Sequence, residues 1–239
     1  MSKILVSIDN LDALPNADGY VLGYEKYTFF SKKRFSYIDI KNFPNQEKLY
    51  LLLNVMLHEN ELDDFKIEAS KLAKLNVNFI VQDLGMVEVL STLVDKSRII
   101  YNPYTLVCNL YEYQTYYEYL KVDIGVSSQL SIDNLEKYVD HSFITIYGYT
   151  PIYQSYRKVI SLFSTHHHTS APKEALLKED TRDNLHHILE NEYGSIIFSS
   201  EPVNLLSDIN RLKNAKYLFI DTNYVSNEKV DEILKGLNR

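Results

Sequence analysis

An arginine and a serine stand out in the segment SFITIYGYTPIYQSYRKVISLF, residues 142–163. A strand pattern breaks at Gly148, and Ser155 and Arg157 follow within an apolar and aromatic run. Arginine is permanently charged and presents a planar fork of donors that suits a carboxylate or a phosphate. We therefore expect Ser155 and Arg157 to bind an anionic ligand. The structural alternative is an internal ion pair of the arginine with one of three acidic residues, Asp83, Asp180 or Asp221.

Polar side chains stand at the ends of most of the predicted strands. In a parallel barrel, chemistry gathers where the strands end, so these side chains are expected to share a pocket. Asp83, paired with Glu88 or Asp221, could supply a carboxylate pair for acid–base chemistry, although its place before a helix also suits helix capping. The predicted ligand-binding residues are Asn54, Gln82, Asp83, Asn102, Tyr147, Ser155, Arg157 and Asp221, with Ser127 and Ser128 as further strand-end hydroxyls.

Histidines occur in two clusters, residues 166–168 and 186–187. Consecutive residues on a strand point to opposite faces and cannot all reach one metal, and a structural zinc site needs four well-spaced ligands. One histidine from each cluster could still share a metal, but we predict solvated loop histidines and no metal site. The sequence contains neither a Gly-x-Ser-x-Gly nor a His-Glu-x-x-His motif, so no catalytic residue is assigned.

Strands alternate with helical patterns along the chain, at a spacing typical of a parallel α/β sheet. Helices are expected between them, among others at residues 61–75 and 203–213. Eight strands predict a TIM-barrel-like (β/α)8 fold, closed or irregular. A doubly wound sheet is the alternative, but no Gly-rich phosphate loop follows any strand. The strand candidates are residues 3–8, 19–24, 49–54, 79–83, 97–102, 121–128, 142–148 and 216–222.

Residues 164–202 interrupt this alternation with a polar, His-rich stretch. Three runs within it, EALLKED, NLHHILE and GSIIFSS, have the character of short antiparallel strands around turns. We predict an inserted loop or β-hairpin before the last barrel strand, within a single domain spanning residues 1–239. Because such loops often carry function, the insertion is expected to lie over the active face.

Composition narrows the class of protein. A chain of 239 residues that is 45% hydrophobic can bury a sizeable core, and its net charge of −7 argues against a broad nucleic-acid footprint. Its one cysteine, Cys108, excludes an internal disulfide and any all-cysteine metal cluster. No apolar run approaches the length of a membrane span. The chain begins directly with a strand and shows no signal-peptide pattern, so a cytoplasmic location and no membrane contact are expected.

Motifs along nearly the whole chain resemble those of the collagenase-like peptidase family U32. They are Leu53-Asn54, His58-Glu59-Asn60, Gln82-Asp83-Leu84-Gly85 and the stretch ENEYGSIIFSSEPVNLL. Residues 142–163 resemble the family's central motif, in which His-Gly-Ala-x-Cys precedes Ser-Gly-Arg-Cys. Here Tyr147-Gly148-Tyr149 and Ser155-Tyr156-Arg157-Lys158 take those places. Pro151 and Lys158 stand where the family has cysteines.

The resemblance implies that the chain is a short member of the family without an iron–sulfur cluster. With Cys108 alone it cannot hold a four-cysteine cluster, so no cofactor is expected. Such members often accompany a larger, cysteine-bearing U32 paralogue. By resemblance, these pairs serve in 5-hydroxylation of the wobble uridine of tRNA, with prephenate as a proposed hydroxyl source. Arg157 would then hold a carboxylate, and tRNA would be a partner. The alternatives are a genuine peptidase of unknown mechanism and a non-catalytic binding module.

Overall fold

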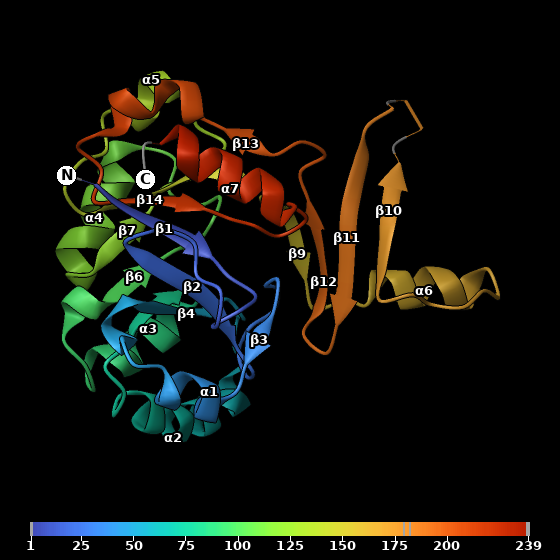
Figure 1. Cartoon of the computed structure of the whole chain (residues 1–239). Coiled ribbons are helices and arrows are strands. Elements are labelled where there is room, and N and C mark those ends of the chain that lie inside the picture. The colour runs from blue at the N-terminus through green and yellow to red at the C-terminus, as the bar shows by residue number, and fades with distance from the viewer. Residues whose placement is uncertain (1, 179, 182, 238–239) are drawn as a thin grey trace. The chain divides into compact units, whose positions relative to one another are not determined.

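The computed structural model describes residues 2–178, 180–181 and 183–237. They form two compact units (Figure 1). Unit 1 is the described part of Met1–Gly148 and Asn204–Arg239, and unit 2 is the described part of Tyr149–Val203. Thus the predicted insertion lies inside unit 2, which begins earlier than residue 164, at Tyr149.

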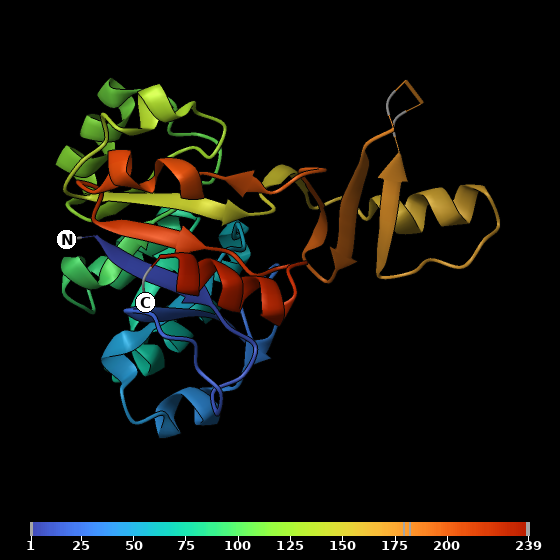
Figure 2. The ribbon, with the colours of Figure 1, turned by 45° about the horizontal axis from the view of Figure 1, so that its top comes forward.

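Unit 1 is a closed barrel of eight parallel strands, which confirms the predicted TIM-barrel-like fold. The first strand closes the barrel by pairing with both the second and the last. Figure 2 shows β8, β14 and β1 side by side with their arrows pointing the same way. The strands are β1 (Lys3–Ser7), β2 (Gly19–Tyr24), β4 (Leu49–Leu53), β5 (Asn78–Val81), β6 (Ile99–Tyr101), β7 (Asp123–Gly125), β8 (Ser142–Gly148) and β14 (Tyr217–Ile220).

Helices of unit 1 connect the strands and surround them in Figure 1. Their starts follow from local capping: Ser36, Asp83 and Ser226 each accept a backbone N–H with the side chain. The helices are α1 (Tyr37–Asn42), α2 (Leu62–Leu72), α3 (Leu84–Ser91), α4 (Leu110–Leu120), α5 (Ile132–Leu135) and α7 (Asn227–Gly236). Shorter elements are β3 (Arg34–Phe35), β13 (Val203–Asn204) and the 3-10 turns η1 (Gln46–Lys48), η2 (Glu59–Glu61), η3 (Lys96–Arg98) and η4 (Leu206–Leu212).

Two elements differ from the prediction. The helix expected at residues 203–213 is the 3-10 element η4, in which the apolar residues Leu206, Ile209 and Leu212 recur every three residues, the period of a 3-10 helix. The strand expected at residues 121–128 is only β7, Asp123–Gly125. Gly125 ends it beside Asn102, where the two backbones approach closely.

Inside the barrel, apolar and aromatic side chains fill the space between the strands. The rings of Phe143 and Phe219 stack at 5.2 Å, and those of Tyr50 and Tyr217 meet edge to face at 5.9 Å. Such pairs add to the hydrophobic burial that stabilises the barrel. The central cluster is Leu5, Val21, Tyr50, Leu52, Ile80, Ile100, Phe143, Tyr217 and Phe219.

Unit 2 is a four-stranded antiparallel sheet in the order β10-β11-β12-β9. The three predicted strand runs are confirmed as β10 (Glu174–Lys178), β11 (Leu185–Asn191) and β12 (Gly194–Phe198), and the unit also holds β9 (Pro151–Ser155) and α6 (Val159–His166). Glu190 of β11 fixes the start of α6, because its carboxylate accepts the N–H groups of Ile160 at 2.7 Å and Ser161 at 3.2 Å.

Candidate functional site at the carboxyl-terminal end of the barrel

Polar residues that were predicted at strand ends do share one end of the barrel. All eight strands run in the same direction, so the residues that follow them lie at the carboxyl-terminal end, where barrels of this class carry their sites. Four predicted residues directly follow β4, β5, β6 and β14, a fifth is one position further on, and Tyr147 lies within β8. The five are Asn54, Gln82, Asp83, Asn102 and Asp221.

The Asn54 side chain is buried and fixes the loop that follows β2. Its Oδ1 accepts the Phe29 N–H at 2.7 Å, and its Nδ2 donates to the Phe30 carbonyl at 3.0 Å and the Tyr104 hydroxyl at 3.2 Å. Both amide hydrogens are therefore used within the protein. Asn54 thus positions the loop that leads to Lys32.

Asn102 positions Tyr104 in the loop after β6. Tyr104 has φ of 57°, a left-handed conformation that costs a non-glycine residue about 1 kcal/mol or more. Asn102 Oδ1 accepts the Tyr104 N–H at 3.3 Å, which supports that conformation. Gly125 makes room for the asparagine, since a Cβ there would lie 2.4 Å from Asn102 Oδ1.

The hydroxyl of Tyr104 lies within electrostatic reach of Asp221. Burial raises the pKa of Tyr104, and the Asp221 charge raises it further, whereas the hydrogen bond from Asn54 acts in the opposite direction. The hydroxyl therefore stays protonated at neutral pH. It accepts from Asn54, and its own hydrogen has no acceptor among the residues that the structure describes.

Asp221 is the most unusual ionisable group at this end of the barrel. The residue is buried, with 6% of its surface exposed. Oδ1 accepts the Asn223 N–H at 3.0 Å, the Asn223 Nδ2 at 2.7 Å and the Ser7 hydroxyl at 3.3 Å. Burial raises the pKa of this carboxyl to about 6, against the hydrogen bonds from Asn223 and Ser7, which lower it. Within the described residues Oδ2 accepts no hydrogen bond, so its capacity as an acceptor is not used by the described chain.

Gly148 makes the position of Asp221 sterically accessible. It has φ of 132°, a conformation that side chains with a Cβ rarely adopt, and a Cβ there would lie 2.5 Å from the Asp221 carbonyl oxygen. The neighbouring Tyr147 is buried, and its carbonyl accepts the Asp221 N–H at 2.8 Å. Gly148, which the sequence indicated as a strand break and as part of the family's central motif, therefore serves the candidate site at the end of β8.

Asp83 and Gln82 form hydrogen bonds with the protein backbone. Asp83 Oδ1 accepts the Met86 N–H at 3.0 Å as the N-cap of α3, and Oδ2 accepts the Leu57 N–H at 3.2 Å. These bonds confirm the capping interpretation of Asp83 and use both of its oxygens. Gln82 is half-buried, and its N–H donates to the Leu53 carbonyl at 3.2 Å.

Ser155 and Arg157 belong to unit 2 and not to the barrel. Ser155 is half-buried in β9, and its Oγ accepts the Arg157 N–H at 3.1 Å. The Arg157 side chain is exposed, and among the described residues of unit 2, which include Asp180, it forms no ion pair. An exposed guanidinium is hydrated and needs neither an internal partner nor a ligand.

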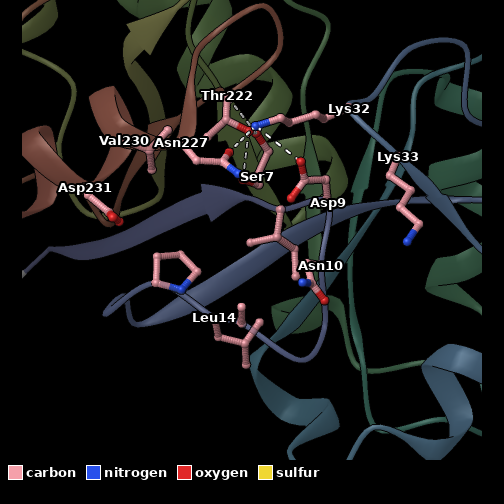
Figure 3. Close-up of a pocket in the computed structure, with 13 residues that line it drawn as sticks. Ser7, Asp9, Asn10, Leu14, Lys32, Lys33, Thr222, Asn227, Val230 and Asp231 are labelled. Carbon is pink, nitrogen blue, oxygen red and sulfur yellow. Dashed lines mark hydrogen bonds and ion pairs between the residues drawn. The ribbon is translucent and has the colours of Figure 1, made fainter.

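A pocket of about 700 Å³ opens beside the Asp221 network (Figure 3). Ser7 and Thr222 line it, and these two residues bond to one another as well, with the Thr222 N–H donating to Ser7 Oγ at 2.6 Å. Lys32 reaches into the same region, where Nζ donates to Asn227 Oδ1 at 2.6 Å and lies 3.3 Å from Asp9 Oδ2. The other lining residues are Ile8, Asn10, Ala13, Leu14, Pro15, Lys33, Val230 and Asp231.

The alternative of a metal shared by the two histidine clusters has no matching group of side chains among the described residues. Among the residues the structure describes, no three His, Cys, Asp or Glu side chains come together in a way that could hold a metal. His187 packs edge to face on Tyr149, and His186 Nδ1 lies 2.9 Å from the Phe198 carbonyl oxygen. Cys108 is exposed.

Sequence patterning missed most of the residues that line this site. The sequence pattern placed Ser7 inside the first strand. Its hydroxyl lies close to the end of that strand, which could have marked it as a candidate site residue. Tyr104 is one of 20 tyrosines and carries no distinguishing pattern. Lys32 arrives through a long loop, and only the contacts of Asn54 reveal that the loop folds back over the barrel end.

Comparison with known proteins adds one finding to this geometry. No curated protein and no solved structure matches the chain. The described helices include none that is long and apolar enough to cross a membrane. The model of peptidase family U32 matches residues 16–237 of the 239-residue chain. A match over nearly the whole length, on a closed parallel barrel, establishes that the chain belongs to peptidase family U32.

Proposed function

We propose that this chain is a non-proteolytic, ligand-binding member of its family and binds a small anionic molecule at the carboxyl-terminal end of the barrel. The observation that carries the proposal is the Asp221 carboxyl. It is buried, its pKa is raised to about 6, and Oδ2 accepts no hydrogen bond from the described chain. A buried carboxyl with a shifted pKa, at the end of a barrel where ligands bind, is typical of a functional site.

Two kinds of group could serve an anionic ligand. Lys32 and Lys33 line the pocket, together with Asp9 and Asp231, and Lys32 already lies 3.3 Å from Asp9 Oδ2. The Tyr104 hydroxyl, within electrostatic reach of Asp221, can donate its hydrogen. A negative group close to Asp221 would raise the pKa of the carboxyl further and protonate it, which turns Oδ2 into a donor. Binding would then take up a proton, so affinity should rise as the pH falls from 8 to 6.

Native mass spectrometry of the protein purified gently from its own cells tests this proposal. We expect a co-purifying small anion that Lys32→Ala and Asp221→Asn weaken or lose. Lys229→Ala is the matched control, because Lys229 pairs with Glu232 on the exposed face of α7 and does not line the pocket. A ligand that survives both pocket variants would contradict the proposal, and one lost only in Arg157→Ala would place anion binding in unit 2.

The family resemblance suggests a partner as well as a ligand. We propose that the chain acts as a cluster-free subunit beside a larger, cysteine-bearing U32 paralogue in tRNA wobble-uridine 5-hydroxylation. Pro151 and Lys158 replace the motif cysteines, which leaves redox chemistry to the partner. Residues 164–202 carry three Lys or Arg against seven Asp or Glu, so the partner would also supply the main contact with tRNA.

A tagged copy expressed at native level tests the subunit proposal. The paralogue should co-purify, and loss of this chain should remove 5-hydroxyuridine derivatives from wobble positions, measured by mass spectrometry of digested tRNA. Unchanged tRNA together with no co-purifying paralogue would refute it. The ligand proposal would still stand, because it rests on the barrel pocket alone.

Peptidase activity is the second candidate, and one contact favours it. The Ser7 hydroxyl donates to Asp221 Oδ1 at 3.3 Å, which resembles a nucleophile beside a carboxyl base. Ser7 Oγ also accepts the Thr222 N–H at 2.6 Å, however, and it is buried. Proteolysis that co-purifies to constant specific activity and disappears in Ser7→Ala would establish the peptidase and refute the non-proteolytic proposal.

A further inference from the structure

Strand β10 is an edge strand of the unit 2 sheet, because the order β10-β11-β12-β9 gives it a neighbour on one side only. Its sequence is Glu-Ala-Leu-Leu-Lys, residues 174–178. Leu176 is 57% exposed and Leu177 is 42% exposed. An exposed apolar edge is a template for a further strand, and soluble proteins usually protect such edges.

The hydrogen-bond pattern shows which backbone groups face away from β11. The Glu190 N–H donates to the Lys173 carbonyl at 2.8 Å, and the register continues with Ala175 opposite Ile188. Hydrogen-bonded pairs alternate along an antiparallel ladder, so residues 173, 175 and 177 bond to β11. The N–H and C=O groups of residues 174, 176 and 178 therefore point to the open edge.

We propose that two copies of this chain associate by antiparallel pairing of their β10 strands, with Leu176 opposite Leu176 of the second copy. In this register Glu174 lies opposite Lys178, and Lys178 lies opposite Glu174. The outward groups of residues 174, 176 and 178 then bond to the same three residues of the other copy. Opposite charges across a strand pair stabilise it, so the strand is complementary to itself in both charge and hydrogen bonding.

Apolar burial points to the same register. Leu176 would pack against its own copy on one face of the joined sheet, and Leu177 would pack beside Ala175 on the other. A shift of the register by one residue would set the outward backbone groups of one strand opposite residues of the other strand that already bond to β11. It would also bring side chains from opposite faces of the joined sheet into register. Since only five residues pair on each side, the interface is small, and we expect a weak dimer with a dissociation constant in the range of about 10 to 100 µM.

Charge reversal tests the register in the full-length protein by sedimentation velocity. Glu174→Lys and Lys178→Glu should each place like charges opposite one another and raise the dissociation constant about ten-fold, whereas the double variant should restore it. Asp183→Ala is the control, because Lys178 also pairs with Asp183 at 2.9 Å within one copy. That variant loses the internal pair and should still dimerise.

Cysteine cross-linking in a Cys108→Ser background tests the same register independently. Residues opposite one another in a bonded pair have Cα atoms about 5.5 Å apart, so Leu176→Cys should cross-link to its own copy through a short bis-maleimide. Glu174→Cys, on the same face, would lie about 13 Å along the strand from its own copy and should not. A monomer at 200 µM, or a dimer unaffected by charge reversal, would overturn the proposal.

Discussion

Replacing Asp221 by asparagine should stabilise the protein, although it removes a group from the candidate site. The residue is 6% exposed, and burial raises the pKa of its carboxyl from 3.8 to about 6. The folded state therefore holds the Asp221 proton more tightly than the unfolded state does. As the pH rises from about 4 to about 6, the unfolded chain releases this proton first, so stability falls across this window.

The size of the effect follows from the shift. About two pKa units at 1.36 kcal/mol each give about 3 kcal/mol of lost stability, complete above pH 6. Asparagine carries no charge, and its Oδ1 can still accept from Ser7 and Asn223 as the aspartate does. We therefore expect Asp221→Asn to gain about 2 to 3 kcal/mol of unfolding free energy at pH 8 and almost nothing at pH 4.

Urea unfolding at pH 8 and at pH 4, followed by circular dichroism and tyrosine fluorescence, measures both values. Asp123→Asn is the matched control, because Asp123 is a buried aspartate with a cationic partner, Lys216 at 2.7 Å, and a histidine, His141, at 3.0 Å. It should lose about 1 kcal/mol or more at pH 8. If Asp221→Asn also destabilises at pH 8, or acts equally at both pH values, then the carboxyl is not strained by burial and the proposed site loses its main support.

Two further substitutions test how the site is built. Gly148→Ala should cost about 3 kcal/mol or more in urea unfolding, because it combines φ of 132° with a Cβ at 2.5 Å from backbone oxygen. Gly236→Ala, where a Cβ would meet nothing within 4 Å, should be neutral or slightly stabilising. Asn54→Ala should release the loop after β2 and cost about 2 kcal/mol. Hydrogen exchange of the Phe29 amide, which Asn54 Oδ1 binds at 2.7 Å, should accelerate by more than that of the barrel strands.

The barrel was predictable because its strands carry a strong local signal. Most strands are short, largely apolar runs, and a polar residue directly follows β2, β4, β5, β6 and β14. The run at residues 49–54 has no exposed position in β4. Closure was not predictable, since it depends on the pairing of β1 with both β2 and β14. The extent of unit 2 was also hidden. Pro151 and Ser155 read as a continuation of the barrel motif, whereas they form the edge strand β9 of another sheet.

The candidate site was predictable only where position along a strand decides the outcome. Asp221 and Asn102 follow strands and were expected at the barrel end. Their roles depend on contacts between distant segments, such as Ser7 with Asp221 across 214 positions of the chain. A side chain's role as ligand contact or as scaffold is set by how many of its hydrogen bonds the protein itself uses. No pattern in the sequence records that number.

The two candidate centres, at Arg157 and at Asp221, differ in what their charged side chains cost the folded protein in stability. Arg157 is exposed, so keeping its charge requires nothing from the fold, and its presence alone says little about function. Asp221 is different, because the protein holds a carboxyl whose ionised form costs about 3 kcal/mol at neutral pH. It also retains a glycine at φ of 132° to make room for that residue. A neutral side chain would be more stable there, so a buried carboxyl in this position supports the proposed site at the barrel end over one at Arg157.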